Sequence, residues 1–199
     1  MKALITLCIA LFVTPTFAST SYKYSDLIIK DYDEMNNMVQ ARIKKSKELG
    51  TKDNDSGGND GEAIEQLRDA LKLVFSRPNS DNMIAKLTPE VRRELSGYNA
   101  FEDTISSIAA DAISIAKEKH GTVTQQSTAF FVLENLLNEI RPEVPGNVDL
   151  KHVVQRIADA NLKISDEVKK DRKIRSMFKT VNPSEVAEDI LKKLPKEKK

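Results

Sequence analysis

Few residues of this chain carry side chains suited to nucleophilic, acid–base or metal chemistry. The 199 residues include two histidines, His120 and His152, and one cysteine, Cys8. The sequence contains no zinc-type histidine pair, no serine-nucleophile turn and no glycine-rich nucleotide loop of the P-loop type. We expect His120 to lie at a helix C-terminus and His152 at the surface. We therefore predict no catalytic residue, no cofactor and no metal.

Carboxylates are plentiful, and two of them at a fixed separation suffice for glycoside hydrolysis. Glu134 is the one charged residue between Gly121 and Asn138. Burial would raise the pKa of its carboxyl and suit it to act as a general acid. The other interpretation is that Glu134 points out of the one polar strip of its helix, since unpaired carboxylates are rarely buried. A cell-wall-directed hydrolase that uses carboxylates is thus one alternative function.

The segment that begins at Asp53 partly matches a calcium-binding loop. Gly58 falls at the sixth position, where an EF-hand loop has glycine, but Gly57 and Ile64 fall at the fifth and twelfth positions. Both of those positions supply oxygen ligands in a working loop. We expect no ordered calcium here. The stretch 51–61 has no apolar residue, and we predict a mobile loop.

Positive charge collects toward the C-terminus. The formal net charge of the chain is +1, yet residues 141–199 hold 15 Lys and Arg against 10 Asp and Glu. A basic helix from Asp166 to Thr180 is predicted to contact an anionic surface through six cations: Lys169, Lys170, Arg172, Lys173, Arg175 and Lys179. The alternative is an ordinary solvated face. Few aromatic residues lie among these cations, so we expect no nucleic-acid partner.

The N-terminus has the pattern of a signal peptide. Lys2 precedes an apolar run from Ala3 to Val13, and the sequence Thr16-Phe17-Ala18 predicts cleavage after Ala18. The run is shorter than the roughly 20 residues that a membrane span needs. Cys8 would leave with this segment. We expect an exported protein without a transmembrane segment after cleavage.

The remainder, residues 19–199, is predicted to be a single all-α domain, an irregular bundle of about seven helices. Apolar residues recur at steps of three and four, and no stretch shows the alternation of a strand. The central pair is predicted to run from Ala100 to His120 and from Val123 to Arg141. Residues 195–199 are expected to form a charged tail.

Several helix starts are predicted from capping residues. Thr88-Pro89-Glu90 has a cap, a proline for the first helical position and an acid near the positive helix end. Thr122 with Gln125 forms a capping-box pattern, Asp149 is the cap expected for the next helix, and Asn182-Pro183 starts the last one. Gly121 is expected to close the helix that precedes Thr122.

One short motif resembles a known family. Leu87-Thr88-Pro89-Glu90-Val91 is similar to the LTxxQ signature of small helical periplasmic stress chaperones, with valine in place of glutamine and a single copy. The resemblance implies such a chaperone as a further alternative. The lack of catalytic motifs favours a non-catalytic helical binding or structural protein whose partner is a macromolecule or an anionic envelope surface. The signal-peptide pattern predicts its export, to a bacterial periplasm or out of the cell.

Overall fold

The computed structural model describes residues 32–51, 60–78, 81–118, 121–170 and 182–195, and these form an all-α bundle without strands. The helices are α1 (Tyr32–Gly50), α2 (Asp60–Phe75), α3 (Asp81–Ser96), α4 (Phe101–Lys117), α5 (Val123–Ile140), the 3-10 helix η2 (Val144–Gly146), α6 (Val148–Asp159), α7 (Asp166–Lys170) and α9 (Pro183–Lys192). The predicted fold class is confirmed.

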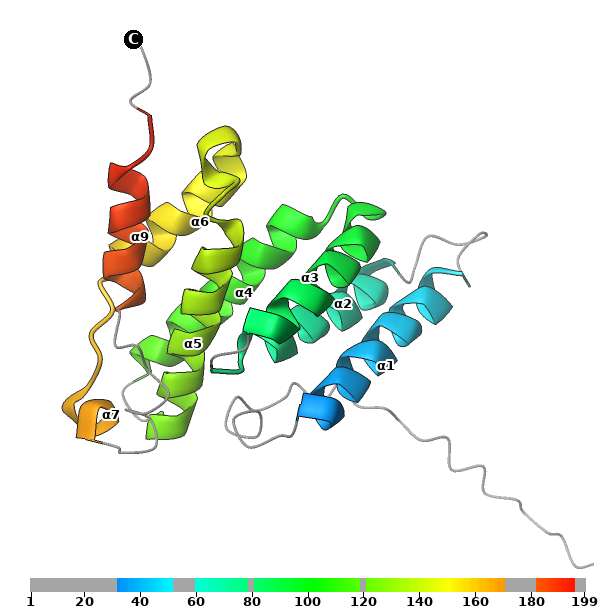
Figure 1. Cartoon of the computed structure of the whole chain (residues 1–199), viewed down its shortest axis with the longest axis horizontal. Coiled ribbons are helices and arrows are strands. Elements are labelled where there is room, and N and C mark those ends of the chain that lie inside the picture. Colours follow the sequence, from blue (N-terminus) through cyan, green and yellow to red (C-terminus); the bar gives the residue numbers. More distant parts are fainter. Residues whose placement is uncertain (1–31, 52–59, 79–80, 119–120, 171–181, 196–199) are drawn as a thin grey trace, which may run out of the picture.

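Helices close in sequence pack against each other along the bundle. Figure 1 shows α1, α2 and α3 at one end and α6 and α9 at the other, with α4 and α5 between them. In α1, Met35, Val39 and Ile43 are buried, as the four-residue spacing predicts. The C-terminus of α2 is bound by a side chain of α5, which lies far from it in the sequence. Asn135 Nδ2 donates to the Phe75 carbonyl at 2.5 Å and to the Arg77 carbonyl at 3.1 Å.

Helix α5 is the central helix, as predicted. It contacts α2, α4, α6, α7 and α9, and most of its circumference is buried. Its start is the predicted capping box: the Gln125 N–H donates to Thr122 Oγ1 at 3.2 Å, and the Thr122 N–H donates to Gln125 Oε1 at 2.9 Å. Each long apolar side chain that this helix buries, Phe130 among them, contributes about 1.5–3 kcal/mol.

The predicted helix start at Thr88-Pro89-Glu90 is wrong. These residues lie inside α3, where Thr88 is fully buried and Pro89 interrupts the hydrogen-bond ladder. The buried stripe of α3 runs through the proline without a break at four-residue steps: Met83, Leu87, Val91 and Leu95. Proline at this place removes the N–H that would donate to the Ala85 carbonyl, and Ala85 is exposed, so the disturbed part of α3 lies on its solvent side.

Two further helix ends differ from the predictions. Helix α4 stops at Lys117, short of His120, because Glu118 is extended and Gln126 Nε2 donates to the Glu118 carbonyl at 3.0 Å. Gly121 does not adopt the left-handed conformation expected of it. Elsewhere, positive φ angles occur at Asn99, before α4, and at Asn161, after α6, at 50° and 47°. Asparagine tolerates that conformation better than most side chains do.

The cap of α6 is Asn147 and not Asp149. Asn147 Oδ1 accepts from the N–H groups of Asp149 and Leu150, each at 3.0 Å, while its Nδ2 donates to Glu102 on α4 at 3.0 Å. Asn147 thus starts one helix and fixes it to another, which an aspartate side chain could not do because it has no N–H to donate.

Helix α9 begins at the predicted cap. Asn182 Oδ1 accepts from the Ser184 N–H at 3.0 Å. Ser184 is buried, donates to the Ile157 carbonyl at 2.8 Å and accepts from the Leu162 N–H at 3.0 Å. These bonds join α9 to the end of α6 and hold the last two long helices as a pair.

Some predictions concern residues outside the described ranges. The signal peptide of residues 1–18 lies there, as do residues 52–59 of the predicted loop 51–61 and residues 196–199 of the charged tail. The C-terminal boundary predicted for the loop is wrong, because Asp60 and Gly61 belong to the first turn of α2. An acidic residue there is stabilised by the positive end of the helix.

Candidate functional site

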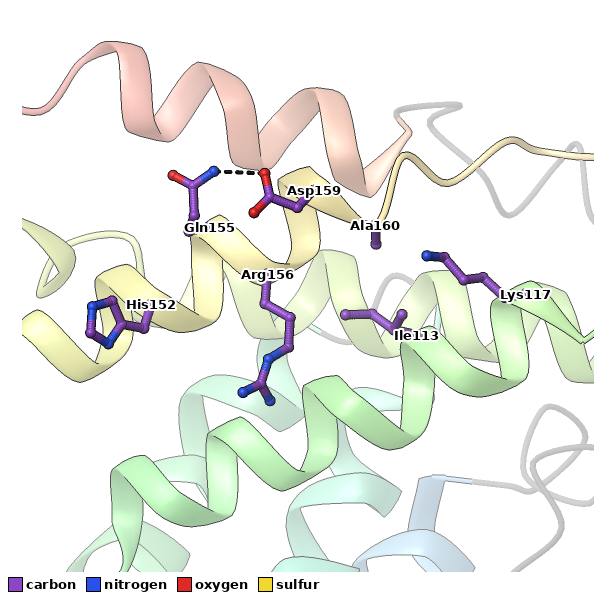
Figure 2. A pocket seen from close by; sticks show the side chains of 7 residues that line it. All are labelled: Ile113, Lys117, His152, Gln155, Arg156, Asp159 and Ala160. Carbon is purple, nitrogen blue, oxygen red and sulfur yellow. Dashed lines mark hydrogen bonds between the residues drawn. The ribbon is translucent and has the colours of Figure 1, made fainter.

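A shallow groove of about 470 Å³ lies between α4 and α6 (Figure 2). Helix α6 buries Leu150, Val153, Val154 and Ile157, and this leaves the opposite strip of the helix facing outward. That strip supplies His152, Gln155, Arg156 and Asp159 to the groove at helical spacing. Helix α4 supplies Ile113 and Lys117, one turn apart, and Ala160 completes the lining.

Two cations of this groove have no ion-pair partner among the described residues. Figure 2 shows Lys117 reaching from α4 toward Ala160 at the end of α6, and the Arg156 guanidinium pointing from α6 toward α4. Arg156 Nη1 donates to Ser106 Oγ on α4 at 3.3 Å, which orients the guanidinium and leaves its other N–H groups free to donate. The groove therefore presents two positive charges from two different helices.

A single carboxylate balances part of this charge. Gln155 Nε2 donates to Asp159 Oδ1 at 2.8 Å, which orients the carboxylate at the edge of the groove (Figure 2). The side chains of Ile113 and Ala160 add apolar surface between the charged groups. The groove thus contains two cations, one carboxylate that accepts hydrogen bonds and a small apolar area.

The histidines fall into different parts of the chain. His152 is exposed and lines the groove between α4 and α6, in agreement with the predicted surface position. His120 lies outside the described residues. Within the described ranges, no group of three or more His, Cys, Asp and Glu side chains is placed to hold a metal ion.

The predicted basic helix is described only at its beginning. Helix α7 contains Lys169 and Lys170, both exposed, and Lys169 Nζ lies 3.5 Å from Asp166 Oδ1. Ser165 Oγ accepts from the Val168 N–H at 3.2 Å, so the predicted start of this helix is confirmed. The other four cations, Arg172, Lys173, Arg175 and Lys179, lie outside the described residues.

Glu134 is half-buried and lines a second groove, between α5 and α9. Glu185 and Asp189 of α9 face the same space, together with Arg141. Lys193 Nζ donates to Asp189 at 2.6 Å, and this hydrogen bond lowers the pKa of the Asp189 carboxyl. Asp189 is therefore held ionised, which suits an ion pair and does not suit a general acid.

A third cluster surrounds Arg92 at the junction of α3, α4 and η2. Both terminal nitrogens of Arg92 donate to the two carboxylate oxygens of Glu143, and the guanidinium lies 4.1 Å from the centre of the Phe101 ring. The hydrogen bond from Arg92 lowers the pKa of Glu143. Burial raises the pKa of Glu139, an effect that Arg92 opposes and Glu143 adds to.

A carboxylate hydrolase needs a carboxyl of raised pKa and a cleft that admits the sugar. Burial raises the pKa of Glu139, whose side chain lines neither groove. Glu134 lines the second groove, beside Glu185 and Asp189.

The motif that resembles the chaperone signature has a packing role in this chain. Leu87, Thr88 and Val91 are buried inside α3, and Glu90 accepts from Gln40 Nε2 at 3.1 Å. None of the described helices combines the length and the apolar composition needed to cross a bilayer. Comparison of the chain with known protein families, curated proteins and solved structures finds no match.

The groove cations were not singled out in the sequence. Lys117 and Arg156 are 39 positions apart, and each stands on a helix with other charged residues nearby. One sequence signal does point to them. Both fall off the apolar stripe of their helix, so pairing the polar edges of α4 and α6 would have brought them into one candidate set.

Proposed function

We propose that this chain is an exported, non-catalytic helical protein that binds an anionic partner. The observation that carries the proposal is the groove between α4 and α6, where Lys117 and Arg156 face one space and neither forms an ion pair within the described part of the chain. Cations that are not already paired attract an anion without first having to break an internal salt bridge.

Two features of the sequence support the same function. The signal-peptide pattern that ends at Ala18 supports export. The basic segment 169–179 would add a second positive surface, of which Lys169 and Lys170 are exposed in α7. Export and a positive surface together fit a protein that meets anionic polymers or lipids of a cell envelope.

The test is a binding titration with polyacrylate, a carboxylate polymer, by isothermal calorimetry at low and high salt. The groove variant is Lys117→Gln with Arg156→Gln. The matched control is Lys44→Gln with Lys45→Gln, which removes the same charge from the exposed side of α1. The proposal predicts that the groove variant binds about five- to tenfold more weakly than the control, with a smaller difference at high salt.

Two results would reject the proposal. Failure of the wild-type chain to bind polyacrylate at low salt would show that the groove does not attract anions. Equal binding by the groove variant and the control variant would show that binding reflects total charge only. Circular dichroism of both variants checks that their helices are intact.

A further inference from the structure

We infer that the groove between α4 and α6 takes a short acidic peptide segment, an inference that rests on the proposed function and names the class of partner. The groove combines features that a bare polyanion does not use. Besides its two cations it contains a carboxylate, an amide and an apolar area. A peptide with acidic side chains has a chemical group for each of them.

The cations stand on different walls of the groove. Lys117 approaches from α4 and Arg156 from α6, so their two charges are presented at separate points (Figure 2). Arg156 is held in place by Ser106, and its remaining N–H groups form a planar fork that fits a carboxylate. Two carboxylates carried by one extended segment match this arrangement better than a single compact anion does.

Asp159 provides the discrimination. Its carboxylate repels phosphate groups and closely spaced carboxylates, because like charges at short range are unfavourable. The same carboxylate accepts hydrogen bonds, and Gln155 already donates one to Oδ1 at 2.8 Å. No other hydrogen bond to Asp159 occurs within the described part of the chain. A backbone N–H of a peptide can donate a second hydrogen bond to this exposed carboxylate, whereas a phosphate group or an acrylate unit has no N–H to donate.

The apolar part of the groove is small. Ile113 is partly buried and Ala160 is buried, so these two residues leave only a small apolar surface exposed between the charges. An extended peptide presents alternate side chains to opposite sides. Glutamates that alternate with alanine therefore all point into the groove, where their carboxylates reach the cations and their methylene groups contact the apolar area.

The experiment compares two ligands with one variant. The ligands are a fluorescein-labelled peptide of alternating glutamate and alanine, and labelled polyacrylate of matched charge. The variant is Asp159→Ala in the full chain, and the matched control is Asp103→Ala, which removes an exposed carboxylate from the first turn of α4. Fluorescence anisotropy gives both dissociation constants at low salt.

The inference predicts effects of opposite sign. Asp159→Ala weakens peptide binding about threefold or more, because a hydrogen bond to a charged acceptor is lost, and it strengthens polyacrylate binding, because a like charge is removed. Asp103→Ala leaves the ratio of the two dissociation constants unchanged. Alanine favours helix at this last position of α6, so we expect Asp159→Ala to fold as the wild type does. Circular dichroism checks that its helices are intact.

Three other outcomes distinguish a failure of the acidic-peptide inference from a failure of the proposed function. If Asp159→Ala strengthens the binding of both ligands equally, the acidic-peptide inference is overturned and anion binding stands. If the groove variant Lys117→Gln with Arg156→Gln loses binding to phosphatidylglycerol vesicles and the wild type ignores the peptide, the partner is a lipid and the inference is overturned. If the groove variant binds both ligands as the wild type does, the proposed function falls as well.

Discussion

The clamp between Arg92 and Glu143 yields a quantitative prediction about stability. Its two parallel hydrogen bonds join α3 to the connection between α5 and α6, and the guanidinium packs on Phe101 at 4.1 Å. Both side chains are about one-third exposed, at 33% and 34%, so the solvent screens part of the attraction. An exposed pair contributes about 0.2–1 kcal/mol and a charge-assisted buried bond about 1.5–3 kcal/mol. The clamp lies between these limits, at about 1–1.5 kcal/mol.

The perturbation is Arg92→Met, which keeps an apolar side chain over Phe101 while it removes the charge. We expect a loss of about 1.5–2 kcal/mol in the free energy of unfolding, since about 0.5 kcal/mol of cation–π attraction is lost with the ion pair. Urea unfolding of the wild type, Arg92→Met, Glu143→Gln and the double variant isolates the pair. The coupling energy from this cycle should be about 1 kcal/mol.

The same cycle has a defined dependence on pH. Arg92 lowers the pKa of Glu143 below its ordinary value, so the folded state binds this proton less tightly than the unfolded state does. The stabilisation is therefore complete above the ordinary glutamate pKa and is lost as the pH falls through the lowered pKa. Coupling energies at neutral pH and in acid, below the lowered pKa of Glu143, should differ accordingly. Additive single variants at pH 7, or a coupling energy that does not change with pH, would refute this reasoning.

Other predictions follow from single contacts. Glu139→Gln should stabilise the fold at neutral pH, and this stabilisation should disappear toward acid pH. The reason is that the raised pKa of Glu139 means that its ionised form is disfavoured in the folded state. Urea unfolding at a series of pH values measures the effect. Asn135→Ala should destabilise the fold by about 1–3 kcal/mol, because two carbonyls at the end of α2 lose their donor; thermal unfolding measures it. Mass spectrometry of the exported chain should show an N-terminus at Ser19. A final variant combines Lys169→Gln, Lys170→Gln, Lys173→Gln and Arg175→Gln. In co-sedimentation it should bind anionic vesicles more weakly than the wild type, most clearly at low salt, while its folding is unchanged.

Local patterns in the sequence predict much of the helical arrangement. The capping box of Thr122 and Gln125 and the proline start at Asn182-Pro183 are both present, because each needs only neighbouring residues to form. The central position of α5 also follows from the sequence, since a helix that is apolar on most sides must be covered on most sides.

The errors arise where a distant part of the chain decides the outcome. Thr88-Pro89-Glu90 has the local features of a helix start, yet the apolar stripe that packs α3 against its neighbours continues through the proline. Asn147 displaces Asp149 as the cap of α6 because it also donates to Glu102 on α4. Sequence neighbours alone do not contain that second contact.

The groove between α4 and α6 was missed for the same reason. Arg156 and Lys117 become neighbours only when the two helices pack, and neither residue belongs to a local motif. The basic segment near the C-terminus is the stronger signal in the sequence, because its six cations stand within eleven positions. Density of charge along the chain is a different property from unpaired charge in one groove.

The central claim, that the groove binds an anion, is tested most directly by nuclear magnetic resonance of the ¹⁵N-labelled chain during titration with polyacrylate. The account predicts that the backbone amides of Ile113 to Lys117 and of His152 to Ala160 shift first and saturate together, and that the amides of Lys44 and Lys45 on α1 stay in place. Shifts spread over all lysine-bearing helices, or an unchanged spectrum around Arg156, would contradict it.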